Sequence, residues 1–361
     1  MMSGKLTIAR IETLLGDDAA YLLDHVCRTI PREHLHRPAP DFVDRVWGAS
    51  DRTPRGLQAL RTLFGHGRLG GSGYLSILPV DHGIAHTAGM VFAKNPAYFD
   101  PAAIVELAIE GGCSALVTTY GLLGAVARAS AHKIPLILKI NHDEQLAYPL
   151  RHDNILFARV EEASAMGCVA VAATVYFGGP EARRQLVEVS EAFAHAHALG
   201  LATILFCYLH PTALKIDGDA LIFSADLTAQ ANHLGVTIEA DLIKQKQPLS
   251  NNGYRALRTR DPAYGKLDER IYTALSTDHP IDLTRYQVAN GYLGRCGLIH
   301  SGGASGEDDL RQAVRAAVIN KRGGGMGMLA GRKAFQAPIA EGVALLHAIQ
   351  DVYLNEAVTV A

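Results

Sequence analysis

Two lysines in one apolar run are the residues of this sequence that point most clearly to chemistry. Lys244 and Lys246 are two positions apart in residues 241–246, a run that otherwise reads as a buried strand. Both side chains would therefore face the same side of that strand. A second ammonium nearby, together with desolvation, lowers the pKa of an amine toward neutrality, which a Schiff-base nucleophile requires. The pair predicts imine chemistry on a carbonyl substrate.

A purely structural role for these lysines stays open when the run is taken alone. A lone strand lysine more often extends to the rim of a sheet and pairs with a carboxylate there. However, Lys139, Tyr208 and Asp81 each stand at the end of another apolar run. Amines, a phenol and an acid at neighbouring strand ends favour the catalytic interpretation, with Lys139 beside the same site.

Two glycine-rich turns near the end of the chain predict a phosphate site. Ser301-Gly302-Gly303 follows one apolar run, and Gly331-Arg332 follows the next. Backbone N–H groups in such turns can donate to a phosphate, and Arg332 adds a charged donor. Glycine pairs also occur in ordinary tight turns. The prediction of a phosphate site therefore depends on the positions of these two turns, which follow consecutive strands.

The sixteen histidines raise the alternative of a metal site. His82 and His86 are four residues apart, and His142 follows another apolar run. The sequence has neither an HExxH motif nor a cluster of cysteines, and loop histidines are usually hydrogen-bonding residues. We therefore expect neither a catalytic metal nor another cofactor.

The reactive residues are positioned by a repeated pattern of short apolar runs and helical segments. Runs that are apolar on both faces are typical of buried parallel strands. Helical spacing is seen in residues 102–110, 156–166, 181–197 and 306–320. The eight apolar runs are residues 74–80, 114–119, 135–140, 169–176, 202–208, 241–246, 297–300 and 326–330. This alternation predicts an α/β fold, a (β/α)8 TIM barrel. The competing open, doubly wound sheet expects a glycine-rich turn after its first strand, and the sequence has VDHGIAH there.

Two regions fall outside the repeat. Residues 1–73 contain an amphipathic helix at 6–15, a second apolar patch at 22–26 and the single Trp47. We expect an N-terminal helical extension that packs on the barrel (residues 74–361) or on another subunit, rather than a disordered tail. Residues 247–295 are too long for a simple loop after the sixth strand, so we expect an insertion with helices of its own that could cover the mouth of the site.

Composition narrows the class of protein further. A formal charge of −2 gives no global attraction to nucleic acid or to an anionic membrane. No run reaches the roughly 18 apolar residues of a spanning helix, and the first residues do not resemble a signal peptide. Five scattered cysteines without a CxxC pair suit a reducing cytoplasm, each as a small core residue. We expect a cytoplasmic homo-oligomer that binds neither nucleic acid nor membranes.

The ordered strand-end motifs resemble one family in particular. SILPVDHGIAH, LILKINHDE, ATVYFG, ADLIKQK, LIHSGG and LAGRKAF occur in this order. They are similar to the archaeal-type class I fructose-bisphosphate aldolases, above all to longer bacterial members with an N-terminal extension. The resemblance covers nearly the whole chain. It implies a metal-independent (β/α)8 enzyme of glycolysis and gluconeogenesis that reversibly cleaves fructose 1,6-bisphosphate to dihydroxyacetone phosphate and glyceraldehyde 3-phosphate. It also implies that the chains assemble into large rings or decamers.

The resemblance also implies roles for individual residues. Lys244 matches the imine lysine and Lys246 an auxiliary cation, Tyr208 the general acid/base and Asp81 the strand-one aspartate. His86 matches a contact for one substrate phosphate. The second phosphate would lie on Ser301, Gly302, Gly303, Gly331 and Arg332.

The sequence departs from the family pattern near the strand-five tyrosine. Phe206 stands where a tryptophan is frequent, and His210 where an arginine is frequent. Phe206 and Lys139 are still expected to line the substrate site. The alternatives are a related lysine-dependent aldolase or a transaldolase-type enzyme acting on another sugar phosphate, a metal-dependent aldolase, and a non-catalytic sugar-phosphate sensor.

Overall fold

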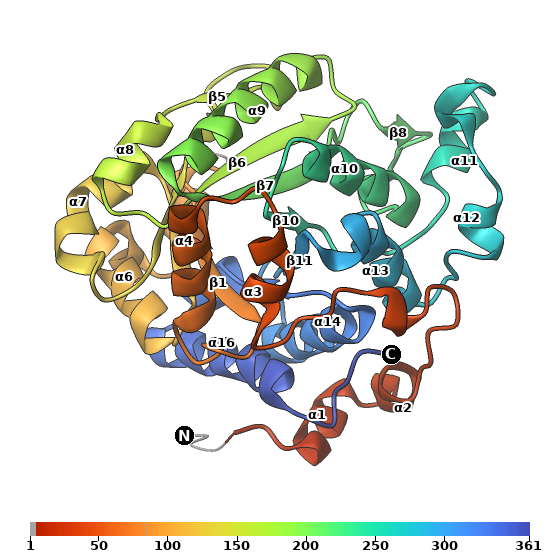
Figure 1. Ribbon diagram of the computed structural model, residues 1–361, viewed down its shortest axis with the longest axis horizontal. Coiled ribbons are helices and arrows are strands. Elements are labelled where there is room, and N and C mark those ends of the chain that lie inside the picture. Colours follow the sequence, from red (N-terminus) through yellow and green to blue (C-terminus); the bar gives the residue numbers. More distant parts are fainter. Residues whose placement is uncertain (1–4, 85) are drawn as a thin grey trace.

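The chain forms a closed barrel of eight parallel strands, seen in a computed structural model that describes residues 5–84 and 86–361 (Figure 1). The strands follow one another around the barrel in chain order, and β1 closes it by pairing with β12. They are β1 (Leu75–Val80), β2 (Ala115–Thr118), β3 (Leu136–Lys139), β6 (Ala170–Phe177), β7 (Ala202–Leu209), β10 (Leu242–Gln245), β11 (Gly297–Ser301) and β12 (Gly327–Leu329). Each of the eight apolar runs overlaps one of them to within one residue at its end, so the predicted barrel is confirmed and the open sheet is wrong.

The seam between β1 and β12 requires a glycine. Gly327 pairs with Leu75, and a Cβ atom on Gly327 would lie 2.0 Å from the main-chain oxygen of Leu75. Because a side chain there would push the two strands apart, glycine lets the last strand close the barrel.

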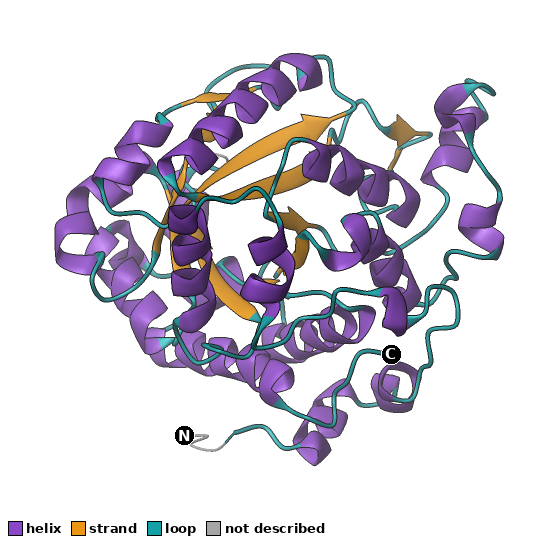
Figure 2. Cartoon of the chain, viewed as in Figure 1, coloured by secondary structure: helices purple, strands orange, loops and turns teal. Residues whose placement is uncertain are grey.

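Eight helices surround the barrel (Figure 2). They are α6 (Pro101–Glu110), α7 (Tyr120–Ser130), α8 (Val160–Ala165), α9 (Ala182–Leu199), α10 (Ala225–Thr237), α13 (Pro280–Ala289), α14 (Asp309–Gly323) and α16 (Ile339–Leu354). The four predicted helical segments correspond to α6, α8, α9 and α14. The helix predicted from residue 156 begins only at Val160, because Asn154–Leu156 forms a strand, β5, that pairs with β4 (Asn141–Asp143).

The N-terminal residues form four helices, α1 (Ile8–Leu15), α2 (Asp18–Leu23), α3 (Phe42–Val46) and α4 (Pro54–Gly65). Phe42, Trp47 and Phe64 pack into one cluster with inward-facing strand residues such as Ile77 and Ile204. α3 and α4 therefore cover one end of the barrel interior (Figure 1). α1 packs on α14 instead. The described part of residues 1–73 therefore packs on the barrel. That these residues form a unit of their own, with a boundary at residue 73, stays a prediction.

Residues 247–295 contain the expected helices, but they are not all an insertion. α11 (Gly253–Arg258) and α12 (Arg270–Thr273) are short additions. α13 packs against α10 and α14 and is the sixth helix of the outer ring. The prediction was wrong on this last part, because the short additions before α13 obscured the strand–helix alternation.

Other features of composition can now be placed. All five cysteines are buried and free, as expected for small core residues. No helix among the described residues is long and apolar enough to cross a membrane.

A fully buried arginine joins the N-terminal region to the ring. Arg285 of α13 donates to the main-chain oxygens of Ile30 at 2.6 Å, Gly323 at 2.8 Å and Arg322 at 3.3 Å. Removing this guanidinium would leave buried carbonyls without a partner. We expect Arg285→Leu to lower the free energy of unfolding by about 3 kcal/mol, measured by urea titration.

The matched control is an exposed arginine that forms an ion pair at the surface. Arg61 bonds Asp44 at 2.6 Å at the surface, so Arg61→Ala should change stability by about 0.5 kcal/mol or less. Equal effects of the two substitutions would contradict the structural role of Arg285.

Candidate active site

One cavity of about 690 Å³ lies at the carboxyl ends of the barrel strands. It brings together all twelve residues predicted for the site. They are Asp81, His86, Lys139, Phe206, Tyr208, Lys244, Lys246, Ser301, Gly302, Gly303, Gly331 and Arg332. Of residues 247–295, all of which the structure describes, Gln247 and Leu249 alone line this cavity, so α11 and α12 are not part of its wall.

The alternation of side chains along each strand explains why these residues meet. Leu242 of β10 points into the barrel with the interior cluster, so Lys244 and Lys246, two and four positions further, continue the inward series. In β3, Ile137 also faces the interior cluster, so Lys139, two positions further, faces the same way. The barrel interior is thus apolar near the amino ends of the strands, and the amines lie at their carboxyl ends.

The amines lie against aromatic rings. The Nζ atom of Lys244 is 3.9 Å from the centre of the Phe206 ring and 5.5 Å from that of Tyr208. Lys246 Nζ is also 5.5 Å from the Tyr208 ring centre, and 4.9 Å from that of Phe223. Lys244 is 8% exposed, so its amine reaches the cavity from a mostly desolvated position beside a phenol.

Burial and mutual repulsion determine the charge of the other two amines. Burial lowers the pKa of Lys139 to about 7, with a further decrease from the charge of Lys244. Burial also lowers the pKa of Lys246 to about 8, and Lys244 and Arg332 add to this decrease. Both groups change protonation close to neutral pH.

Asp81 is the acidic residue among the described residues that line the cavity. Burial alone would raise its pKa, but the attraction of His82, Lys244 and Lys139 together outweighs burial and holds this pKa well below its usual range. Asp81 is therefore an ionised carboxylate that faces several cations.

Lys139 is held in place by Asn141. Its Nζ donates to the main-chain oxygen of Asn141 and, at 3.1 Å, to its side-chain oxygen. The Asn141 side chain also exchanges hydrogen bonds of 2.7 and 2.8 Å with the backbone of Thr174 on β6. The sequence analysis did not assign this function to Asn141.

The predicted phosphate contact His86 lies in the cavity as a weakly basic group. Burial lowers its pKa, and Arg332 adds to the effect. Its neighbour His82 has a pKa lowered to about 4, first by burial, and the two rings lie 5.7 Å apart. At neutral pH His86 would therefore contact a phosphate as a neutral hydrogen-bond donor.

The two glycine turns meet as predicted. The N–H of Gly302 donates to Leu329 of β12 at 2.7 Å. The N–H groups of Gly303 and Ala304 make no hydrogen bond with any described residue. A Cβ atom on Gly331 would lie 2.6 Å from the main-chain oxygen of Pro79. The first turn thus leaves two backbone donors for an anion, and the absence of a side chain at Gly331 lets the second turn lie close to β1.

The cavity as a whole is strongly cationic. Six lysine and arginine side chains and one carboxylate, Asp81, line it among the described residues. The cations are Lys139, Lys244, Lys246, Arg315, Arg332 and Lys333. Lys333 is engaged by Asp309 at 2.5 Å and Gln312 at 2.7 Å. The remaining cations suit a ligand that carries more than one negative charge.

Sequence reasoning missed several residues of the cavity. Tyr176 of β6 lies beside Tyr208 with ring centres 5.9 Å apart, and burial raises its pKa. Its place at the end of an apolar run was a signal that could have identified it. Arg315 gave no such signal, because it belongs to a helix and not to a strand end.

His210, which stands where the family often has an arginine, does not line the cavity. Its Nε2 donates to the main-chain oxygen of Arg151, and its Nδ1 accepts from Thr212 and from the N–H of Ala213, each at 3.1 Å. Both ring nitrogens are therefore used within the protein and are not offered to a ligand.

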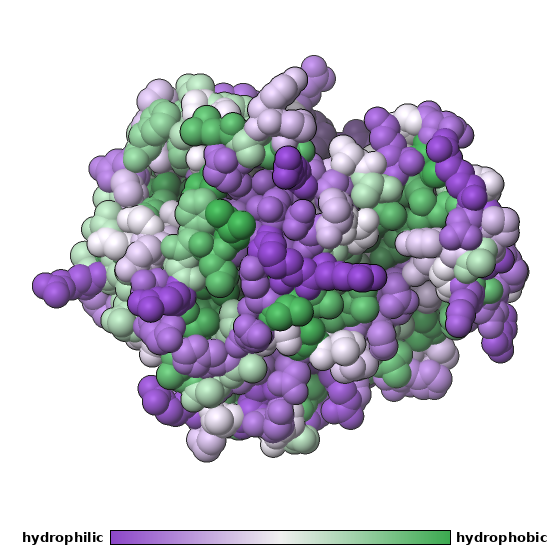
Figure 3. Space-filling model, turned by 90° about the horizontal axis from the view of Figure 1, so that it is seen from above, coloured by the Kyte–Doolittle hydropathy of each residue, from purple (hydrophilic) through white to green (hydrophobic). Residues whose placement is uncertain are grey.

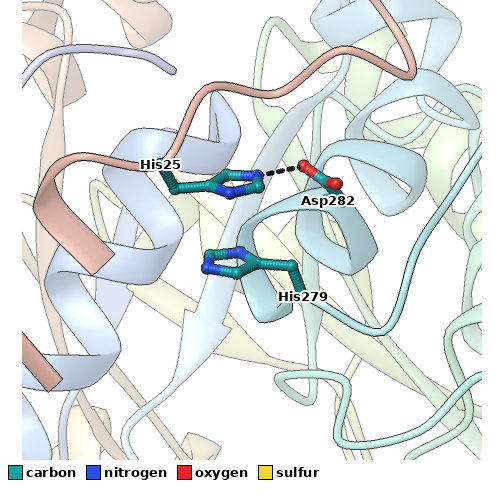
Figure 4. A group of neighbouring side chains, drawn as sticks. All are labelled: His25, His279 and Asp282. Atoms are coloured by element: carbon teal, nitrogen blue, oxygen red, sulfur yellow. Dashed lines mark hydrogen bonds and ion pairs between the residues drawn. The ribbon is translucent and has the colours of Figure 1, made fainter. Parts of the chain in front are cut away.

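A group of potential metal ligands, His25, His279 and Asp282, lies outside the cavity (Figure 4). His25 Nε2 is 2.7 Å from an oxygen of Asp282, and the two imidazoles stack at 3.5 Å with planes 6° apart. Since the lone pairs of stacked rings lie in parallel planes, they do not converge on one ion. His279 also uses both nitrogens, toward Tyr21 and Ile281, so the group holds the N-terminal region to α13.

The fold and this cavity define a (β/α)8-barrel enzyme with amines, a phenol and a carboxylate at the carboxyl ends of its strands. The chain belongs to the DeoC/LacD family of aldolases, whose sequence model matches residues 75–337. The predicted kinship with class I aldolases is confirmed by the relatives.

The relatives match almost the full chain. A probable fructose-bisphosphate aldolase class 1 of Chlamydia pneumoniae is 54% identical, over 97% of this chain and 99% of its own. Its counterpart in Chlamydia trachomatis is 53% identical, over 96% and 98%. Among solved structures, a fructose-bisphosphate aldolase from Slackia heliotrinireducens has a TM-score of 0.66 at 21% identity, covering 90% of this chain and 92% of its own. This last likeness shows the fold.

The low pKa of Lys246 makes one property of the site depend on pH. Below a pH of about 8 the Lys246 amine carries a positive charge that attracts phosphate, and above this pH the charge is lost. We expect the KM for a phosphorylated ketose to rise about tenfold as pH increases through this value, measured by steady-state kinetics. In Lys246→Arg, which stays charged, the rise should move to higher pH. Identical profiles would contradict a role of Lys246 in binding.

Proposed function

We propose that the chain is a Schiff-base-forming class I aldolase that reversibly cleaves fructose 1,6-bisphosphate to dihydroxyacetone phosphate and glyceraldehyde 3-phosphate. The relatives of 53–54% identity carry this activity in their names. The observation that carries the proposal is the desolvated amine of Lys244, 3.9 Å from the Phe206 ring centre, in a cationic cavity. Such a reaction is a step of glycolysis and gluconeogenesis.

The chemistry begins at Lys244. The amine of Lys244 gives a proton to a base and adds to the substrate ketone, and return of that proton lets the added hydroxyl leave as water, which gives a protonated imine. The carbon–carbon bond then breaks, and its electron pair moves toward the imine nitrogen to form an enamine, while the hydroxyl proton of the departing aldehyde is taken up by a base. Protonation of the enamine carbon and hydrolysis of the imine release the second product. All covalent intermediates of the cleavage are thus carried by one side chain.

Tyr208 and Asp81 would assist these steps. The Tyr208 ring lies 5.5 Å from the Nζ atoms of both Lys244 and Lys246, so its hydroxyl can move a proton to or from the imine intermediate. The ionised carboxylate of Asp81 can accept hydrogen bonds from substrate hydroxyls and orient them. These assignments follow the family pattern and the positions of the residues in the cavity.

The two ends of the substrate would bind on opposite sides of this centre. The glycine turns with Arg332 offer donors for one phosphate, and His86 would contact the other, as the family pattern implies. Holding both ends aligns the reacting carbon with the amine of Lys244.

A related lysine-dependent aldolase or transaldolase-type enzyme is the second candidate. The internal hydrogen bonds of His210 favour it, because a charge that the family often provides for phosphate is missing at this position. The two candidates differ in which ketose phosphate is cleaved fastest. The class 1 names of the relatives disfavour a metal-dependent aldolase, and membership of an aldolase family disfavours a non-catalytic sensor.

We also propose that the enzyme is a cytoplasmic homo-oligomer, such as the decamer that the family resemblance implies. Apolar side chains are strongly exposed in residues 146–157, where Leu146 is 93% and Tyr148 98% exposed. On the face drawn in Figure 3, hydrophobic residues gather in patches among hydrophilic ones, which supports contacts between subunits. Sedimentation equilibrium should give a mass that is a multiple of 38.7 kDa, and a monomer at all concentrations would contradict this.

Trapping of the imine tests the catalytic proposal. Borohydride added with dihydroxyacetone phosphate should leave one reduced adduct on Lys244, located by peptide mass spectrometry. We expect Lys244→Met to lose the adduct and more than about a thousandfold in kcat. Lys246→Met is the matched control, and it should retain the adduct. An adduct on Lys246 or Lys139, or full activity of Lys244→Met, would contradict the assignment.

A further inference from the structure

An arginine of α14 lies in the cavity wall beside the glycine turns. Arg315 is three residues after Gln312 on the same helix, and both line the cavity with Ser301 and Gly303. Gln312 accepts a hydrogen bond from Lys333, which directly follows the second turn. Because residues three apart share a helix face, Arg315 lies next to the place where the turns offer backbone donors.

The N-terminal region fixes this arginine. Nε of Arg315 donates to Oδ2 of Asp18 at 2.7 Å, although the two residues are 297 positions apart. Asp18 is the first residue of α2. A second contact lies nearby, where Arg311 donates to the main-chain oxygen of Leu15 at 3.2 Å. The N-terminal region therefore reaches the mouth of the site along α14.

The contact with Asp18 leaves part of the guanidinium for a ligand. Nη1 and Nη2 of Arg315 make no hydrogen bond with any described residue. The side chain is 35% exposed and that of Asp18 is 38% exposed, so the pair adds little stability. Its effect is to hold a flexible side chain in one place, which reduces the entropy that is lost when an anion binds.

We propose that Arg315 is a specificity-determining residue that binds a phosphate of the substrate, and that Asp18 is a positioning residue for it. This inference rests on the proposed aldolase function, since it assigns a further contact to the same bisphosphate substrate. It gives the N-terminal region a function in substrate selection, in addition to its packing on the barrel.

Kinetics of four variants test the proposal. Arg315→Gln should raise the KM for fructose 1,6-bisphosphate about tenfold with kcat within about twofold, because a charge-assisted hydrogen bond to phosphate is lost. Asp18→Asn should raise KM by about threefold, and it should add nothing in the Arg315→Gln background, because Asp18 acts through Arg315. Arg315→Lys keeps the charge without the forked donor and should give an intermediate KM.

Arg311→Gln is the matched control, because it removes the neighbouring contact with the N-terminal region without touching the cavity. Its KM should equal that of the original enzyme. An unchanged KM in Arg315→Gln and Arg315→Lys, or additive effects of Asp18→Asn and Arg315→Gln, would overturn the proposal. Borohydride trapping separates this outcome from a failure of the proposed function. If an adduct forms on Lys244 in all variants, the overturned proposal is that of Arg315 alone. If no adduct forms in the original enzyme, the aldolase function itself is contradicted.

Discussion

Desolvation of several amines around one carboxylate is the constraint on which the site depends. The parallel strands end at one rim, and their inward positions carry Lys139, Lys244 and Lys246 into a cavity in which Asp81 is the acid among the described lining residues. Three cations cannot all remain charged cheaply in such a place. The protein responds by making two of these amines weak bases, and a phosphorylated substrate would supply the missing negative charge.

The rest of the barrel makes this arrangement possible by separating stability from chemistry. The end of the interior opposite the cavity is filled with aliphatic and aromatic side chains, including Phe42, Trp47 and Phe64 from the N-terminal helices. This apolar half stabilises the fold through burial. The upper half can therefore hold ionisable groups that contribute little to stability. The N-terminal region contributes to both halves of the barrel. Its helices α3 and α4 close the apolar end, and Asp18 contacts Arg315 at the cavity end.

The strands and the inward lysines could be predicted because both depend on short-range patterns. Strands buried on two faces are apolar throughout, and Lys244 and Lys246 share a face by parity alone. Roles such as that of His86 came from resemblance, and they remain proposals. Contacts between distant positions carry no local pattern. The pairing of Asp18 with Arg315 spans 297 residues. The hydrogen bonds of Lys139 to Asn141, two positions away, depend instead on side-chain geometry. Neither could be read from the sequence.

The most direct test of the central claim is an NMR titration of the amines themselves. Carbon-13-labelled lysine, with signals assigned by single Lys→Arg substitutions, reports the protonation of each side chain in the folded enzyme. The account predicts midpoints near 7 for Lys139 and near 8 for Lys246. Midpoints of both amines at the ordinary lysine value of 10.5 would contradict it, because the cavity would then neither desolvate these groups nor bring them close enough to repel one another.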